Sequence, residues 1–399
     1  MHIVFLTTEY PGVTKQSGGI AEYTRKISMK SVAFGHEISI IVAGDRDYFK
    51  KEKKINIIVF KSLDYWKGID GNIFNQSIRI LRILINSYRF GREVNKLNQK
   101  ANIDIVQSSN YLSPILFVSN KYPVICRVSS YAPLLREAYG KKSKIINKIE
   151  DLLELLSTKK AFRIISPSKL MSEIYSRKFK KEIMVIKTPI DDSFRNSHTK
   201  SVKKISRNYR VITYFGSLSR LKGVDLIADI ALEILREYKD VIFLFVGKDY
   251  GIPGYGTVVH YINEKVGKVN PRVIIKDSLD RGSLFSLIED SYCSLFPSRI
   301  DNLPNGCIEA ISLGIPVIGS NKSSLEEMII DGKTGYIFEN SESKDLKNKI
   351  EKILNLPLSE YKEMRKNVNL LYNKIQRERR TQALITYYKK TLNEFKSKK

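Results

Sequence analysis

Cysteine is scarce in this sequence, and long apolar runs are absent. The three cysteines, Cys126, Cys293 and Cys307, lie in or beside apolar segments and show no metal-ligand spacing. They are typical of reduced thiols in a protein core, not of a disulfide framework or a zinc site. No apolar run approaches the ~20 residues that a membrane-spanning helix needs. The apolar start, residues 1–9, is too short for a secretion signal, so we expect a first strand there.

Two familiar nucleotide-binding motifs are incomplete. Gly18-Gly19 is not followed by the third glycine of a dinucleotide-binding fingerprint, and no acid ends the second predicted strand at the usual place. Gly332-Lys333-Thr334 resembles the end of a kinase phosphate loop, but position 327 is Glu where that loop needs glycine. The sequence therefore predicts neither a dinucleotide-binding protein with this fingerprint nor a kinase with this phosphate loop.

Acidic residues are outnumbered along the whole chain. The sequence has 68 Lys and Arg against 42 Asp and Glu, a net charge of +26, and residues 1–200 hold 35 basic against 18 acidic side chains. This excess indicates an anionic partner such as lipid headgroups, nucleic acid or a charged substrate. Genome base composition is an alternative source of part of it. Because no nucleic-acid recognition motif is present, we predict no nucleic-acid partner and favour an anionic membrane surface, with the protein cytoplasmic and peripheral on the inner face.

Length and periodicity predict two α/β domains. A chain of 399 residues is too long for one core, and its 42% hydrophobic content is typical of globular proteins. Short β-rich runs alternate with longer amphipathic stretches, which is typical of doubly wound α/β domains. We expect strands at 2–7, 37–43, 55–60, 104–107, 123–128, 163–166, 183–187, 210–215, 240–246, 272–276, 292–296, 315–319 and 336–338. The polar residues 195–208 predict a linker, with a hinge at about 190–208, and residues 358–399 predict two helices.

A glycine turn follows the first strand of each half. Gly18-Gly19 opens a helix after the first strand, and Gly216 follows the strand at 210–215. Such turns let backbone N–H groups approach an anion closely. In the second half, Lys222-Gly223 precedes a helix predicted at 224–237, so a fixed positive charge lies at the helix start.

The stretch from Pro297 to Ile318 carries two acids around a short helix. An apolar strand ends at Pro297, and a polar loop leads into a helix that we expect Asn305 to cap and Gly314 to end. Asp301 and Glu309 have seven residues between them, one ahead of the helix and one just inside it. Both can reach a ligand lying across the helix start. The alternative is a surface loop with two unrelated acids.

These motifs together resemble those of family-4 retaining glycosyltransferases of the GT-B fold. The acid pair resembles the family's E-x₇-E signature, with Asp301 in place of the first Glu. Residues 216–223 are similar to its Gly-Arg-Leu-x-x-x-Lys-Gly phosphate loop, with Ser217 in place of the usual Arg and Arg220 as a candidate replacement. Gly18-Gly19 and the Gly-His-Glu-Ile run at 35–38 match the family's first-domain turns. The resemblance covers nearly the whole chain and is strongest for 210–340.

The resemblance implies a fold and a division of labour. It implies two Rossmann-like doubly wound domains that face each other across a cleft. Residues 1–195 would bind the acceptor, residues 196–375 would bind the nucleotide sugar, and a last helix at 376–399 would cross back to the first domain.

It also implies roles for single residues. Glu309 would hold the ribose, Lys222 the diphosphate and Asp301 the donor sugar. Other donor-site residues would be Gly18, Gly19, Gly216, Ser217, Arg220, Asn302, Leu303, Pro304 and Asn305. The nucleobase would lie near 276–279. Many members have a His near the position that Ser129 occupies in this chain. Because this chain lacks that His, Arg127, Ser129 and Ser130 are named only as candidate contacts.

The implied activity is that of a metal-independent, retaining hexosyltransferase without a cofactor. It would move a sugar from a nucleotide diphosphate sugar, UDP-sugar favoured over GDP-sugar, to a saccharide or lipid-linked saccharide in cell-surface polysaccharide or glycolipid assembly. The alternatives are a nucleotide-sugar epimerase and a non-catalytic partner subunit of the same fold. Basic amphipathic stretches at 72–101 and 141–156 are either ordinary surface helices or faces turned to a membrane.

Overall fold

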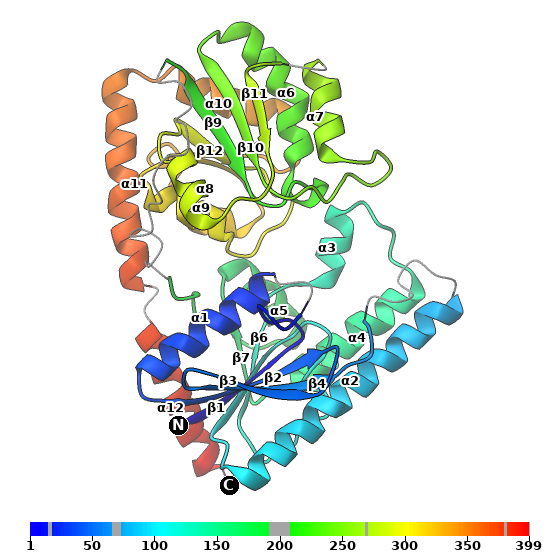
Figure 1. Ribbon diagram of the computed structural model, residues 1–399. Coiled ribbons are helices and arrows are strands. Elements are labelled where there is room, and N and C mark those ends of the chain that lie inside the picture. The colour runs from blue at the N-terminus through cyan, green and yellow to red at the C-terminus, as the bar shows by residue number, and fades with distance from the viewer. Residues whose placement is uncertain (15–17, 66–72, 191–207, 268–269, 379–380, 399) are drawn as a thin grey trace. The chain divides into compact units, whose positions relative to one another are not determined.

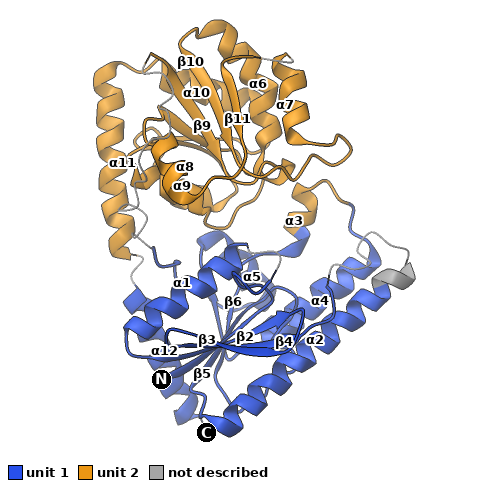
Figure 2. Cartoon of the chain, viewed as in Figure 1, with its two compact units in different colours: residues 1–133, 142–190, 379–399 blue, residues 134–141, 191–378 orange. Residues whose placement is uncertain are grey.

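The structure is a computed structural model of the 399-residue chain, and it describes all residues except 15–17, 66–72, 191–207, 268–269, 379–380 and 399 (Figure 1). The chain divides into two compact units (Figure 2). Unit 1 comprises Met1–Pro133, Lys142–Ile190 and Arg379–Lys399, and unit 2 comprises Leu134–Lys141 and Asp191–Glu378. The predicted linker and hinge lie, apart from their ends, outside the described residues. Within the described ranges, no helix is long and apolar enough to cross a membrane.

Unit 1 is built on an eight-stranded sheet in the order β3-β4-β2-β1-β5-β6-β7-β8. The neighbouring strands are parallel except for the antiparallel β3–β4 pair. The central strands β1 and β5 are buried along their whole length, as expected for parallel strands covered on both faces. The strands are β1 (His2–Thr7), β2 (Glu37–Gly44), β3 (Tyr48–Glu52), β4 (Ile55–Lys61), β5 (Ile105–Ser109), β6 (Val124–Arg127), β7 (Arg163–Ser166) and β8 (Met184–Val185).

Helices complete unit 1. They are α1 (Gly19–Ala33), α2 (Ile73–Lys100), α4 (Ile145–Lys160), α5 (Lys169–Phe179) and α12 (Thr381–Ser397), while α3 (Ala132–Ala138) runs from unit 1 into the segment assigned to unit 2.

Unit 2 contains a six-stranded, fully parallel sheet in the order β11-β10-β9-β12-β13-β14. Its strands are β9 (Arg210–Phe215), β10 (Val241–Val246), β11 (Val273–Lys276), β12 (Cys293–Phe296), β13 (Val317–Ser320) and β14 (Gly335–Phe338). Its helices are α6 (Val224–Glu237), α7 (Val258–Val266), α8 (Arg281–Ile288), α9 (Asn305–Ser312), α10 (Ser343–Leu354) and α11 (Leu358–Glu378), with short 3-10 turns η2 (Arg220–Lys222) and η3 (Ser324–Glu327).

The strand predictions are confirmed in both units. Every predicted strand is present, and the ends differ by at most two residues. β3 was not expected, because Tyr48–Glu52 is polar and largely exposed and forms an edge strand without a buried face. The two helices predicted in the tail are also present, as α11 and α12.

The last helix, α12, packs into the core of unit 1. Leu384, Ile385 and Tyr388 join the apolar cluster of β1, β2, β4 and β5. The Tyr388 hydroxyl donates to Gln107 Oε1, and Gln107 Nε2 donates to the Tyr23 hydroxyl at 2.8 Å. A buried hydrogen-bonded chain therefore links α12 to β5 and α1.

Replacing Tyr388 with Phe tests this chain. Tyr388→Phe leaves the buried Gln107 oxygen without its donor, so we expect the free energy of unfolding to fall by about 1–3 kcal/mol. Urea denaturation followed by circular dichroism measures the change. The control is Tyr88→Phe, which removes an exposed hydroxyl and should change nothing. Equal stability of the two variants would contradict a stabilising role for the Tyr388–Gln107 bond.

Candidate active site

Two loops of unit 2 lie together at the carboxyl ends of neighbouring strands. The first follows β9 and covers 216–223, and the second follows β12 and covers 297–304. Because β9 and β12 are paired in parallel, both loops leave the same edge of the sheet, where α/β proteins bind ligands. The loops are in direct contact, since the Arg299 amide donates to the Leu221 carbonyl at 3.0 Å.

Gly223 makes this close approach possible. It lies between η2 and α6 in the left-handed conformation, with φ 70°. A Cβ placed on it would come within 1.9 Å of the Pro297 carbonyl oxygen. Only glycine meets both requirements, which explains why the sequence has glycine here.

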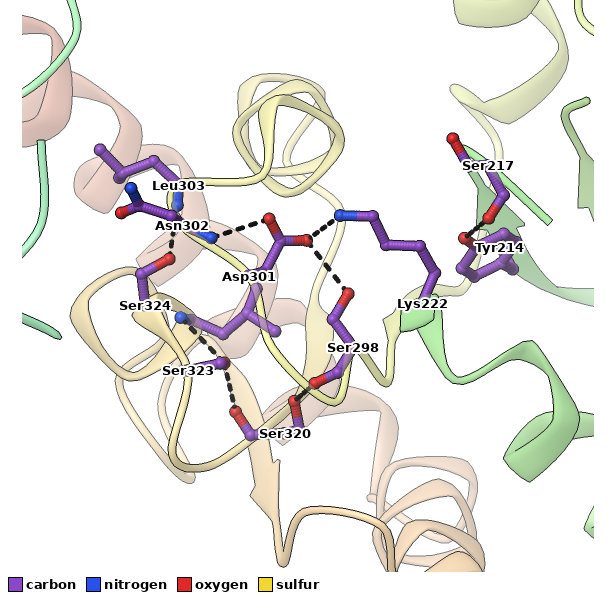
Figure 3. A network of polar contacts seen from close by, with 11 residues as sticks. Tyr214, Ser217, Lys222, Ser298, Asp301, Asn302, Leu303, Ser320, Ser323 and Ser324 are labelled. Carbon is purple, nitrogen blue, oxygen red and sulfur yellow. Dashed lines mark hydrogen bonds and ion pairs between the residues drawn. The ribbon is translucent and has the colours of Figure 1, made fainter. Parts of the chain in front are cut away.

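The two loops are joined by an ion pair of the predicted site residues. Lys222 Nζ lies 2.5 Å from Asp301 Oδ2 (Figure 3). The same carboxylate accepts from Ser298 Oγ at 3.1 Å and from the Asn302 amide at 2.9 Å. Asp301 is largely buried, whereas Lys222 is partly exposed. The structure thus brings together the predicted phosphate cation and the predicted sugar-binding acid.

A serine scaffold holds the loop after β12. Leu303 has φ 61° and is buried, and its amide donates to Ser324 Oγ. Ser320 Oγ donates to the Ser298 carbonyl, and Ser323 Oγ donates to the Ser320 carbonyl at 2.9 Å (Figure 3). The amides of Asn302 and Leu303, two of the predicted donor-site residues, are therefore engaged within unit 2.

The expectation that Asn305 caps the helix after this loop is wrong. Asn305 is the first residue of α9, and Pro304 occupies the capping position with an extended backbone. Proline has no side-chain acceptor, so no side-chain hydrogen bond caps α9 in the described part of the chain. The helix dipole makes the start of α9 a favourable place for an anion. The helix ends as expected, with Gly314 in the left-handed conformation.

Glu309 meets a residue that the sequence did not reveal. Its Oε1 lies 3.3 Å from Arg281 Nη2, and Arg281 is the first residue of α8. The segment predicted to hold the nucleobase, 276–279, immediately precedes α8. An arginine in the first turn opposes the helix dipole, and that local conflict is a signal by which Arg281 could have been found.

Ser217 and Arg220 are used within unit 2. The Tyr214 hydroxyl donates to the Ser217 carbonyl at 2.7 Å. Arg220 Nη1 lies 3.9 Å from Asp225, whose two oxygens both accept from Arg299 at 2.7 Å. Arg299, which was not among the predicted residues, therefore clamps the loop after β12 to α6.

In unit 1, the predicted glycine turn already holds an anion of the chain itself. Gly18 caps α1, and its amide donates to Glu9 Oε2 at 2.9 Å. Burial raises the pKa of Glu9, and the amides at the start of α1 partly offset this rise. Gly19 is the first residue of the helix, and a Cβ on it would meet nothing within 4 Å.

The residues after β6 are tied into unit 1. Arg127 is buried against the Tyr23 ring, 3.9 Å from its centroid, and donates to Ser129 Oγ at 2.8 Å. Burial lowers the pKa of this guanidinium. The Ser130 carbonyl accepts from Asn110 and Tyr175, both at 2.9 Å. These contacts hold the residues after β6 against unit 1. They also give the Arg127 side chain partners within the protein, so its position does not require a ligand.

Unit 1 has a cavity of about 480 Å³ at the carboxyl ends of β1, β2, β4 and β5. Its lining combines apolar residues such as Val13 and Leu112 with polar ones, which include Thr8, Glu9, Asp45, Asp64, Tyr65 and Tyr111. The carboxylates among them are potential acceptors for the hydroxyl groups of a ligand.

Comparison with known proteins agrees with this geometry. A family described as Glycosyl transferases group 1 matches residues 196–370, and one described as Glycosyltransferase Family 4 matches residues 17–194. The chain belongs to the family-4 glycosyltransferases. Its two parallel-sheet units form the GT-B fold expected for the family.

Individual relatives of this glycosyltransferase are distant. The capsular polysaccharide biosynthesis glycosyltransferase CapM of Staphylococcus aureus is 28% identical over 161 residues, which are 38% of this chain and 38% of CapM. This match thus spans little more than a third of that relative. Sucrose-phosphate synthase from Thermosynechococcus elongatus has a similar fold, with TM-score 0.74 and 15% identity over 98% of this chain and 99% of that one. Anabaena HepE, solved in complex with UDP and glucose, has TM-score 0.67 and 14% identity over 99% and 100% of the two chains.

Gly223→Ala tests the contact between the two loops. We expect it to lower stability more than Gly332→Ala, although both glycines have φ near 70°. Gly332 has open space around its Cβ position, so alanine there costs only the left-handed conformation, about 1–2 kcal/mol. At Gly223 the clash with Pro297 adds about 1–3 kcal/mol. Thermal unfolding measures both, and equal losses would show that the loops are not held in contact.

Proposed function

We propose that this glycosyltransferase transfers a sugar from a nucleotide diphosphate sugar to an acceptor hydroxyl with retention of the anomeric configuration. The observation that carries the proposal is the pairing of Lys222 with Asp301 where the loops after β9 and β12 meet. We further propose cell-surface polysaccharide or glycolipid assembly as its setting, supported by the similarity to CapM.

Binding of the donor would separate the ion pair, and each of its two side chains would then contact the donor. Its diphosphate would take Lys222, which supplies positive charge where the leaving group gains negative charge. Asp301, released from the lysine, would accept hydrogen bonds from the donor sugar. Glu309 would hold the ribose, with Arg281 fixing the position of its carboxylate. The N–H groups at the start of α9 add a partial positive charge to the same region.

The chemical step needs no protein nucleophile in this proposal. The bond between the anomeric carbon and the phosphate oxygen breaks, and a bond to the acceptor oxygen forms on the same face of the sugar. The acceptor's proton passes to the departing phosphate oxygen, which leaves a nucleoside diphosphate. The protein contributes orientation and charge stabilisation. Because Lys222 and the α9 amides supply the positive charge, we propose that no metal ion is required.

The acceptor would bind in unit 1. The cavity beside Glu9, Asp45 and Tyr111 is large enough for a sugar ring, and its carboxylates can accept from the hydroxyl groups of a saccharide. A saccharide at the end of a lipid carrier would satisfy the same cavity. UDP-sugar is the favoured donor, which the UDP and glucose held by HepE support.

Alanine variants of Lys222 and Glu309 test the proposed site. Each should lower turnover by about 10²–10³ if it acts in the transition state, measured as nucleoside diphosphate release with a saccharide acceptor. The matched control is Lys333→Ala, which removes an exposed lysine from the turn at 332–334 and should keep full activity. Thermal shifts with UDP-, GDP- and ADP-sugars, with and without EDTA, identify the donor beforehand, because a bound ligand raises the melting temperature. Near-normal transfer by both alanine variants would remove these residues from the site.

Asp301→Glu restores the acid usual in the family. We expect it to retain activity, because the longer carboxylate keeps the charge opposite Lys222. Asp301→Asn should lose most of its activity, since the amide cannot accept from sugar hydroxyls with the strength of a carboxylate. NMR of the product with the active variant reads the anomeric configuration. A folded but inactive Glu variant would show that the carboxylate is placed differently from the family pattern.

A further inference from the structure

The outward side of α4 in unit 1 is apolar. Ile145, Ile149, Leu152 and Leu156 follow one another at helical spacings of four, three and four residues, so they form a single stripe. Between 40% and 75% of each residue's surface is exposed. We call these four residues the α4 stripe. Soluble helices normally turn such a stripe inward.

The inward side of α4 is correspondingly polar. Ser157 and Thr158 are fully buried. Glu150 pairs with Arg79 of α2, and Glu154 accepts from the Leu112 amide at 3.0 Å. Glu150 and Glu154 thus attach α4 to unit 1, beside α2 (Figure 1), and do not lie along the stripe.

Lysines border the stripe. Lys148 and Lys159 lie next to it on the helix, and Lys142 and Lys144 directly precede the helix. All four are exposed, and none of them forms an ion pair with another residue that the structure describes. By contrast, basic residues of α2 have protein partners. Arg79 contacts Glu150, Arg89 donates to the Lys61 carbonyl, and Lys96 pairs with Glu93. The basic side of α2, considered from the sequence, is therefore the weaker candidate for a charged partner.

We propose that the α4 stripe and its bordering lysines form a docking surface for a bilayer containing anionic lipids. An apolar ridge between lysines matches the acyl boundary and the anionic headgroups of such a bilayer at once. The net charge of +26 also attracts the chain as a whole to an anionic bilayer. A second copy of the chain fits less well, because an α4-to-α4 contact would bring the lysines of both copies together. The residues that define this surface all lie on α4 or directly before it. The proposal rests on the proposed function in one respect, since a lipid-linked acceptor would place the reaction at a membrane.

Co-sedimentation of the full chain with vesicles tests the surface. The vesicles contain phosphatidylcholine alone, or phosphatidylcholine and phosphatidylglycerol in equal amounts. We expect binding to the anionic vesicles only, and weaker binding at raised salt. The double variant Ile149→Ser with Leu152→Ser should bind about tenfold more weakly or worse, because it removes the buried apolar area. Replacing Lys142, Lys144 and Lys148 with Gln should weaken binding about a hundredfold.

A matched control lies in unit 2. Leu358→Ser with Leu370→Ser removes two leucines of α11 that are exposed to a similar degree, and it should bind vesicles like the unaltered protein. Unchanged melting temperatures and unchanged transfer to a soluble acceptor in the α4 variants would separate this surface from the sugar-transfer site. The proposal is overturned if the unaltered protein ignores anionic vesicles, or if the α4 and α11 variants lose binding equally. It is also overturned if sedimentation shows a dimer that the α4 variant breaks, since a second copy would then cover the stripe.

Discussion

The contact between the loops after β9 and β12 is the constraint on which the candidate site depends. Parallel pairing of the two strands sends both loops to one edge of the sheet, and a glycine without a Cβ lets them touch. Once they touch, a lysine from one loop and an aspartate from the other fall within hydrogen-bonding distance. Arg299 reinforces the arrangement by binding both oxygens of Asp225 at the start of α6. The charged groups are thus positioned by backbone geometry before any ligand arrives.

Much of this could be predicted from sequence because the signals are local. The strand His2–Thr7 contains the unbroken apolar run 3–6 and precedes a glycine turn, and α6 begins directly after Gly223. The prediction that Asn305 caps α9 was wrong because Pro304 takes the capping position, one residue earlier. The Lys222–Asp301 pair joins residues 79 positions apart, and no periodicity reports a contact between two loops. The contact of Arg281 with Glu309 was hidden for the same reason, although the position of Arg281 in the first turn of α8 is itself a local signal.

Helix α4 shows a different limit of sequence reasoning. Its pattern correctly indicates one apolar and one polar face, but the pattern is the same whichever face meets the protein. The orientation is decided by Arg79 and by the Leu112 amide, which bind the two glutamates of the helix. These partners lie on other elements, so only the structure reveals that the apolar side is the outer one.

The ion pair of Lys222 and Asp301 has a consequence for selectivity. In the resting protein each charge neutralises the other, so separating them leaves two partly buried groups in need of partners. A bare phosphate can satisfy the lysine but repels the aspartate, and a free sugar can satisfy the aspartate but not the lysine. A molecule that carries both an anionic group and hydroxyl groups can provide partners for Lys222 and Asp301 when it binds. Under the proposed function, the ion pair would therefore favour a nucleotide sugar over a bare phosphate or a free sugar.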